Sequence, residues 1–415
     1  MKVSKYNIFF NYQNKVIGFN GISKDYIILE KELYNLYITC LNSNVDDINI
    51  VHPEFYEYLK SKLFIIDNSI DEFEEFKEEI KKIDFDDTKY ELHINPTMNC
   101  NFKCWYCYET HIENSSMDSK MIERVKLFIS NTINNNNSKL KIFSINWFGG
   151  EPLLAFNKSI IPILTYANDL CMKKGIKFYT LFTTNGLLLN ERKLKELKKF
   201  NVNEFQITLD GHRERHDKVR FCSDKRGSYD TIVKNIILAA SLGFKVSVRI
   251  NFTKETFDGL ENIITDFTNI DEQAKENIVF DFHQIWQDKT DLNKEQKAAI
   301  DKFAQNGFNV ITSLDYSFYP SYFTCYADKK NNANINHNGD IYKCTARDYT
   351  KSNREGILNK NGLIDWNDKY YERLDSKFKN KACFECSILP ICRGGCSQHA
   401  IEKKDTNICI HHFNE

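Results

Sequence analysis

Three closely spaced cysteines are the strongest chemical feature of this chain. Cys100, Cys104 and Cys107 have C-x3-C-x2-C spacing and follow the alternating run 91–95. Close thiolates at such spacing suit an iron–sulfur cluster. Three of them leave a four-iron cube one protein ligand short, so the open iron can bind a small molecule and the spacing indicates a catalytic cluster. The alternatives are a zinc site completed by His111 or a group of buried free thiols.

A second set of cysteines lies near the C-terminus. Its members are Cys325, Cys344, Cys383, Cys386, Cys392, Cys396 and Cys409. A zinc ribbon would use only the four from 383 to 396 and leave the other three without a role. The chain has 13 cysteines and no signal-peptide pattern, which favours metal or redox chemistry over disulfides. The remaining Cys40, Cys171 and Cys222 are expected to be ordinary buried thiols.

Strand and helix patterns alternate from residue 90 onward and must position these cysteines. Helical stretches with caps and terminal glycines separate the candidate strands. The strands are expected at 91–95, 142–148, 177–183, 203–209, 245–251 and 278–285. Such alternation predicts a parallel sheet with right-handed crossovers, here a partial (β/α)6 TIM barrel with its chemistry at the carboxyl ends of the strands.

Polar and glycine-rich motifs follow three of these strands. Glycines in Phe148-Gly149-Gly150-Glu151-Pro152 let the backbone approach a ligand, and the glutamate offers a carboxylate to an ammonium group. The residues of interest are Gly149, Gly150, Glu151, Asn185, Thr208, Asp210 and, ten positions later, Arg220. Taken singly, these motifs also fit turns or an exposed ion pair. On the last two strands the pairs 249/251 and 281/283 each share one face.

Together the cysteine triad, the aromatic Tyr106 before its last cysteine and the Gly-Gly-Glu-Pro motif resemble the radical S-adenosylmethionine (SAM) enzymes. The resemblance implies that SAM chelates the open iron. One electron, from a reductant such as flavodoxin or ferredoxin, then yields a 5′-deoxyadenosyl radical that abstracts hydrogen from the substrate. The expected cofactor contacts are Tyr106, Gly149, Gly150, Glu151, Asn185, Thr208, Asp210 and Arg220.

The C-terminal cysteines resemble the SPASM domain of peptide-modifying radical enzymes. This resemblance implies two auxiliary [4Fe-4S] clusters, and thus three clusters in all. One would be held by Cys383, Cys386, Cys392 and Cys409. The other would be held by Cys325, Cys344 and Cys396. Seven cysteines leave one of eight positions open, and Cys222 is an outside candidate for it.

The N-terminal part predicts a separate module. Strands are expected at 6–12, 15–19 and 63–66, and helices at 30–40, 53–62 and 71–87. This order is similar to the winged-helix-like leader-recognition elements of peptide-modifying enzymes, although the module could also merely cap the barrel. The expected domains are 1–87 for leader recognition, 88–310 for the radical SAM barrel and 311–415 for the SPASM domain.

These resemblances predict a maturase of a ribosomally made peptide (RiPP) that installs a thioether or carbon–carbon cross-link. Sulfatase maturases carry an aspartate where Thr345 follows Cys344, which disfavours formylglycine formation. That activity, epimerisation and a non-catalytic iron–sulfur adaptor remain alternatives, and no catalytic base is identified. With 57 acidic and 56 basic residues and no membrane-length apolar run, we expect a cytoplasmic protein without a nucleic-acid or membrane partner.

Overall fold

The computed structural model describes the chain except for residues 136–138, 223–225, 312–323, 404–408 and 410–415. The chain forms two compact units. One, here the terminal unit, contains described residues from Met1–Asp86, Tyr316–Lys330 and Tyr371–Glu415. The other, the barrel unit, contains those from Asp87–Asp315 and Asn331–Tyr370. Among the helices that are described, none has the length and apolarity to cross a membrane.

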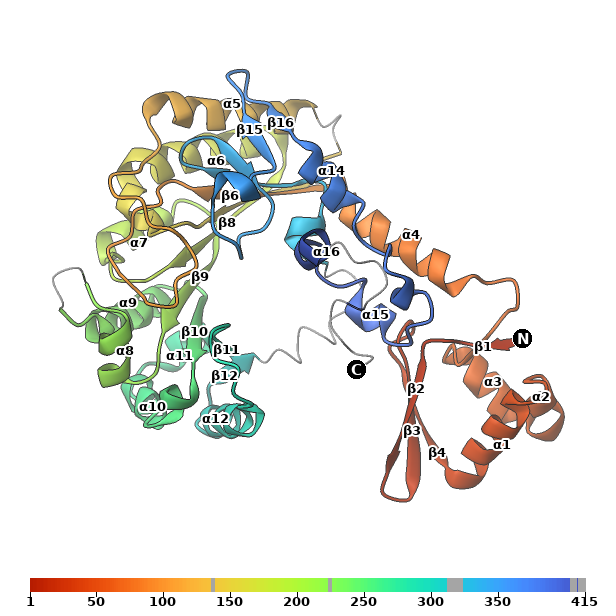
Figure 1. Cartoon of the computed structure of the whole chain (residues 1–415). Helices are drawn as coiled ribbons and strands as arrows, with labels where there is room; N and C mark the ends of the chain where they lie inside the picture. The colour runs from red at the N-terminus through yellow and green to blue at the C-terminus, as the bar shows by residue number, and fades with distance from the viewer. Residues whose placement is uncertain (136–138, 223–225, 312–323, 404–408, 410–415) are drawn as a thin grey trace. The chain divides into compact units, whose positions relative to one another are not determined.

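Parallel strands form the centre of the barrel unit and confirm the six predicted strands. In spatial and chain order they are β6 (Lys89–Asn95), β7 (Ile142–Trp147), β8 (Lys177–Thr184), β9 (Val202–Leu209), β10 (Val246–Phe252) and β11 (Ile278–Gln284). Figure 1 shows these strands as a curved sheet with helices on its outer side. Large apolar side chains such as Trp147, Phe182 and Phe205 are fully buried in the core.

The sheet extends beyond the six predicted strands at both edges. Strand β12 (Asn309–Ile311) pairs with β11, and β13 (Asn332–Asn336) pairs in parallel with β6. Antiparallel strands continue from β13: β14 (Asp340–Tyr342), β15 (Gly356–Leu358) and β16 (Ile364–Trp366). The described sheet is therefore mixed and has eleven strands, and the segment after Cys325 completes its edge next to β6.

The predicted helices of the barrel unit are present with small changes at their ends. They are α5 (Ser119–Asn135), α6 (Ile161–Lys174), α7 (Glu191–Leu197) and α9 (Tyr229–Ser241). A 3-10 turn and a π turn occupy Pro152–Ala155 and Phe156–Ile160 before α6. Further helices are α8 (Arg213–Val219), α10 (Glu261–Thr268), α11 (Glu272–Glu276) and α12 (Asn293–Gln305). The side chain of Asn190 caps α7, and left-handed Gly175 ends α6, as expected.

The N-terminal part of the terminal unit is a small α+β module. Its strands are β1 (Lys2–Val3), β2 (Asn7–Tyr12), β3 (Lys15–Asn20), β4 (Tyr26–Glu30) and β5 (Ile65–Ile66). Its helices are α1 (Lys31–Leu41), α2 (Asp47–Val51), α3 (Pro53–Ser61) and α4 (Glu72–Asp84). Strand β4, directly before the helix predicted at 30–40, was not predicted; buried and exposed residues alternate along it. Strands β2, β3 and β4 form one antiparallel sheet.

The C-terminal cysteine segment packs with this N-terminal module. After α14 (Asp368–Leu374), it contains the short helices α15 (Leu389–Cys392) and α16 (Ser397–Lys403). Tyr6, Phe76, Ile80 and Leu389 form one buried cluster within the terminal unit. Compact packing therefore joins residues that the sequence assigned to separate modules, and the domain limits 1–87, 88–310 and 311–415 stay predictions.

Candidate functional site

The cysteine triad lies in the loop after β6, in an apolar environment. Cys100 and Cys104 pack against the barrel core, and Cys107 is the most exposed of the three. Burial raises the pKa of the Cys100 thiol to about 12 and that of Cys107 to about 11, while the Arg220 guanidinium opposes both shifts. A desolvated thiol becomes a thiolate when a cation binds it, so these side chains suit metal ligation.

Backbone N–H groups donate to several of the predicted cluster ligands. The amide two residues on donates to Sγ of Cys100 and of Cys344, each at 3.4 Å. Backbone amides also donate to the Cys107 and Cys392 thiols, from Glu109 and Gly394. Such donors stabilise thiolates and tune iron–sulfur clusters. The residues present therefore fit the cluster that the spacing predicts.

The zinc alternative fits less well. The Cys107 Sγ lies 3.5 Å from His111 Nε2. Within the described ranges, however, no three His, Cys, Asp or Glu side chains converge on a point where one metal ion could bind. Ligands of a four-iron cube each bind a different iron, so they need not converge in that way.

The Gly-Gly-Glu-Pro loop packs directly against the residues that precede Cys100. A Cβ on Gly150 would lie 2.2 Å from the Asn99 carbonyl oxygen. Gly149 has φ +82°, and a Cβ there would lie 2.7 Å from the Asn95 Cβ. The Glu151 amide donates to the Asn99 carbonyl at 2.8 Å. Only glycines allow this approach, which sets the loop beside the cysteine triad.

The Glu151 carboxylate joins this loop to the end of β8. It is fully buried and accepts from the Leu153 amide at 3.0 Å, the Thr184 hydroxyl at 2.7 Å and the Asn185 amide at 2.8 Å. The Asn185 side chain in turn donates to Asn101 Oδ1 at 2.7 Å. The carboxylate of Glu151 already accepts three hydrogen bonds from the protein. An ammonium group could therefore bind this loop only through the remaining lone pairs of that carboxylate and through backbone carbonyls.

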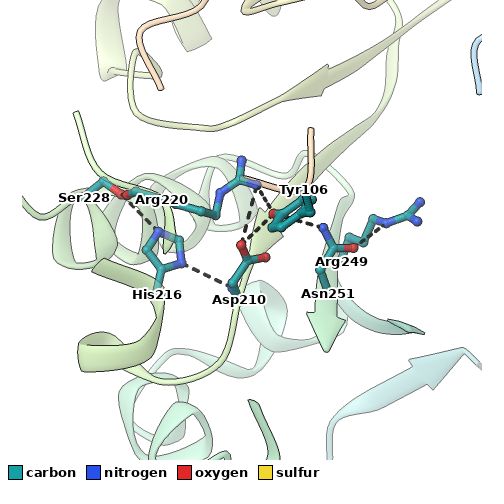
Figure 2. A network of polar contacts seen from close by, with 7 residues as sticks. All are labelled: Tyr106, Asp210, His216, Arg220, Ser228, Arg249 and Asn251. Carbon is teal, nitrogen blue, oxygen red and sulfur yellow. Dashed lines mark hydrogen bonds and ion pairs between the residues drawn. The ribbon is translucent and has the colours of Figure 1, made fainter. Parts of the chain in front are cut away.

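Tyr106 is the centre of a polar network that joins three other predicted or noted residues (Figure 2). Its hydroxyl donates to Asp210 Oδ2 at 2.6 Å. It accepts from Arg220 NH1 at 2.7 Å and from Asn251 Nδ2 at 3.2 Å. Arg220 NH1 and Asp210 Oδ2 are themselves 3.9 Å apart, and both side chains are buried. The structure thus brings Tyr106, Asp210 and Arg220 together, as the resemblance implied.

His216 connects the two sides of this network, and the sequence alone did not assign it a role. Its Nδ1 accepts from the Asp210 amide at 3.3 Å, so Nε2 carries the proton and donates to Ser228 Oγ at 3.0 Å. Ser228 Oγ then donates to the Arg220 carbonyl at 2.6 Å. Burial, with Arg220 adding to it, lowers the pKa of His216 well below its ordinary value and keeps the ring neutral. The ring therefore fixes the backbone at both charged residues (Figure 2).

The two expected same-face pairs on β10 and β11 are confirmed. Arg249 Nε donates to Asn251 Oδ1 at 3.0 Å, and His283 Nε2 lies 2.7 Å from Asp281 Oδ2. Thr208, on β9, stands next to Arg249 in the sheet register. These polar side chains follow one face of adjacent strands, and Asn251 links them to the Tyr106 hydroxyl.

An open cavity of about 620 Å³ lies at the carboxyl ends of β9 to β11. Tyr106, Asp210 and Asn251 line it, together with Trp105, whose side chain is largely exposed. Charged residues contribute to its wall as well: Arg215, Lys218, Lys254, Glu255 and Asp288. The cavity therefore borders both the cysteine loop and the polar network.

Contacts of the loop after Cys107 could not be read from the sequence. Tyr108 stacks on Trp286 with ring centroids 5.3 Å apart and donates to the Thr345 carbonyl at 2.8 Å. The Thr110 amide donates to Asp348 at 2.8 Å. Burial, with Asp348 nearby, raises the pKa of the Glu109 carboxyl to about 8. Sequence separations of more than 170 positions hide these pairs from any local pattern.

Four of the C-terminal cysteines lie close enough within the terminal unit for their charges to shift one another's pKa. Burial raises the pKa of Cys383 and Cys392 to about 11 each, and the thiols of Cys386 and Cys409 add to both shifts. Cys325 and Cys396 also belong to the terminal unit and Cys344 to the barrel unit. Their grouping around a second auxiliary cluster stays a prediction. Cys222 forms an isolated antiparallel bridge with Phe102, which lies within the cysteine triad in the sequence.

Comparison with known proteins agrees with this geometry. Residues 94–267 match the model of the radical SAM superfamily. The radical SAM cyclopropyl synthase TigE of Paramaledivibacter caminithermalis is 26% identical over 410 residues, which cover 91% of this chain and 81% of that protein. A cysteine-type anaerobic sulfatase-maturating enzyme of Clostridium perfringens is 26% identical over 356 residues, covering 78% and 92%. The crystal structure of Streptococcus suis SuiB superposes with a TM-score of 0.55 and 20% identity, covering 98% and 97%.

The barrel unit thus contains a radical SAM domain with its α/β fold and large mixed sheet. The protein is an enzyme with a radical SAM domain, similar to the cyclopropyl synthase and to the sulfatase-maturating enzyme. A radical SAM domain implies a [4Fe-4S] cluster and SAM. Cys100, Cys104 and Cys107 are the ligands that fit the cluster.

Proposed function

We propose that this enzyme abstracts hydrogen from a ribosomally made precursor peptide and closes a thioether or carbon–carbon cross-link in it. The observation that carries the proposal is the open cavity of about 620 Å³ beside the cysteine loop, which has polar and aromatic residues in its wall. Its size leaves room for a substrate side chain next to the cofactor. The solved structures of SuiB include one bound to its precursor peptide SuiA.

When bound, the reduced cluster and SAM supply a 5′-deoxyadenosyl radical. The chain's own residues orient the cofactor and the reacting side chain. By resemblance, Arg220, Asp210 and Thr208 would bind SAM. Glu151 and Asn185 hold the Gly-Gly loop against the cysteine loop. One substrate hydrogen leaves with the adenosyl carbon. Closing the bond then releases one proton and one electron, so the reaction needs an oxidant near the substrate.

Two auxiliary [4Fe-4S] clusters would supply that oxidant. One closed cluster has four proposed ligands: Cys383, Cys386, Cys392 and Cys409. Charge interactions among their thiols support this group. Cys325, Cys344 and Cys396 are the proposed ligands of the other cluster, which would then have one iron without a cysteine ligand and available to the substrate. An external flavodoxin or ferredoxin would reduce the catalytic cluster.

The N-terminal module is the proposed site for the leader of the peptide. Among the described strands, β4 is an edge of its three-stranded sheet, so its outer backbone groups can pair with an extended peptide. The exposed face of the same sheet is apolar: Phe10, Tyr12, Tyr26 and Ile28 are each at least 50% exposed. Such surface favours binding of a peptide over a purely structural cap.

A cyclopropane closed within one side chain is the second candidate product. The observation in its favour is the similarity to the cyclopropyl synthase TigE over 91% of this chain. This product also removes two hydrogens from the peptide, so fragmentation must separate it from a cross-link. Formylglycine formation is less favoured, because Thr345 stands where sulfatase maturases have an aspartate.

Coexpression with a precursor encoded beside the gene, followed by mass spectrometry, tests the function. Loss of two hydrogens, with fragments that localise the bond, is the expected result; an unchanged mass would favour epimerisation and contradict the cross-link. Leader binding is tested with Ile28→Lys, against Ile50→Lys on α2, where the side chain is 82% exposed. Weaker peptide affinity in the first variant alone supports the leader site, and equal affinities would leave the module structural.

A further inference from the structure

A buried aromatic side chain from the start of the chain lies beside the C-terminal cysteines. Tyr6 belongs to the cluster of Phe76, Ile80 and Leu389, and both Cys383 and Cys386 pack against this cluster. Two further contacts nearby join the start of the chain to the cysteine segment. Lys5 Nζ donates to the Phe384 carbonyl at 2.8 Å, and the Phe73 and Phe384 rings lie 4.9 Å apart. The N-terminal module thus forms one wall of the region where the proposed ligands gather.

The Tyr6 hydroxyl is buried and has no hydrogen-bond partner within the described residues. The residue itself is 0% exposed. Buried tyrosine hydroxyls normally find a partner, because leaving one unpaired costs free energy. The backbone of Tyr6 is held on both sides, since its amide donates to Ser4 Oγ at 3.2 Å and its carbonyl accepts from the Gly21 amide at 3.0 Å. The ring therefore cannot easily turn the hydroxyl towards water.

The acceptors near this hydroxyl are limited. Burial raises the pKa of Tyr6, and the charges of Glu72, Asp71, Cys386 and Glu385 add to the shift, in that order. The Glu72 carboxylate is already bonded to the Ser4 hydroxyl and to the Lys5 amide. The Asp71 carboxylate caps α4 through the Phe73 and Glu74 amides. The Glu385 side chain is exposed to solvent, so the sulfur at Cys386 is the remaining acceptor that is shielded from water.

We propose that the Tyr6 O–H donates a hydrogen bond to a sulfur atom of the auxiliary cluster held by Cys386, which rests on the proposed function because that cluster is part of it. Reduction adds negative charge to a cluster, and a donor to its sulfur atoms stabilises the reduced form more than the oxidised one. The hydroxyl therefore raises the reduction potential of this cluster. A higher reduction potential suits a cluster that accepts the electron released when the cross-link in the peptide forms.

The test is a redox titration of Tyr6→Phe in the full-length, reconstituted protein. Replacing Cys100, Cys104 and Cys107 by Ala in all samples removes the catalytic cluster, so the EPR signals come from the auxiliary clusters alone. Cys386→Ser identifies the signal of the relevant cluster. We expect its ratio of reduced to oxidised form at a fixed potential to fall roughly tenfold in Tyr6→Phe, equivalent to about 59 mV for one electron.

Tyr37→Phe is the matched control in the same unit. Tyr37 is also 0% exposed, but its hydroxyl accepts from Asn7 Nδ2 at 3.1 Å. This variant loses a bond that already exists, so its unfolding midpoint should fall while the cluster potential stays as in the parent. An unchanged potential in Tyr6→Phe, with both clusters present, would overturn the inference. If the protein with only the triad replaced by Ala binds no iron, the proposed auxiliary clusters themselves are overturned.

Discussion

Removing the Tyr106 hydroxyl should weaken SAM binding far more than it disturbs the fold. Tyr106→Phe deletes a 2.6 Å bond to Asp210, a 2.7 Å bond from Arg220 and a 3.2 Å bond from Asn251. Hydrogen bonds to charged groups contribute about 1.5–3 kcal/mol each. Because Arg220 and Asp210 are already 3.9 Å apart, they can close into a direct pair and recover part of this loss. A net effect of about 2 kcal/mol corresponds to roughly 30-fold weaker binding if these two residues hold the cofactor.

The assay is equilibrium binding of SAM to the reconstituted enzyme, followed by the change in the EPR signal of the reduced cluster. Tyr229→Phe is the control, because the Tyr229 hydroxyl donates to Asp266 Oδ2 at 2.8 Å and the cavity lining does not include it. Both variants lose a bond to a carboxylate and should lower the unfolding midpoint. Only Tyr106→Phe should change the affinity for SAM. Equal affinities in the two variants and the parent would refute the role of the network in cofactor binding.

Two further predictions concern the supports of the site. Gly150→Ala would place a Cβ 2.2 Å from the Asn99 carbonyl, so the loop must shift and SAM affinity should fall at least tenfold, whereas Gly175→Ala, which has open space around its Cβ, should lower only thermal stability. His216→Asn should make stability less dependent on pH on the acid side, as measured by thermal unfolding from pH 5.5 to 7.5. The folded-state pKa of His216 is lowered, so below about pH 6.5 the unfolded chain binds a proton that the folded parent does not. The parent therefore loses up to about 1.4 kcal/mol of stability per pH unit as the pH falls, and the variant should not. Identical slopes in parent and variant would show that the ring is not held neutral.

The central strands could be predicted because each is a short apolar run bounded by a motif. Strand β8, for example, alternates buried and half-buried residues from Phe178 to Thr184, where it ends directly before Asn185. Strand β4 was missed because its run continues directly into α1, which hid the change from a period of two to a helical period. Strands β14 to β16 have three residues each, too few for a pattern, so the extension of the sheet was not predictable.

The site residues were predicted by type and motif, but not their partners. Tyr106 and Asp210 are 104 positions apart, and only the fold shows that one hydroxyl joins Asp210 to Arg220. Glu151 was expected to face the cofactor, whereas most of its bonds hold the end of β8. The packing of Cys383 and Cys386 against the cluster that contains Tyr6 also had no sequence signal, because hydrophobic packing leaves no spacing rule across more than 370 positions.

Reductive cleavage of SAM tests the central claim most directly. The parent enzyme, reconstituted and reduced, should form 5′-deoxyadenosine and methionine. The variant with Cys100, Cys104 and Cys107 all replaced by Ala should form none, yet should still bind iron through the C-terminal cysteines. Full cleavage by that variant, or none by a parent with its clusters intact, would contradict the assignment of the triad as the catalytic centre.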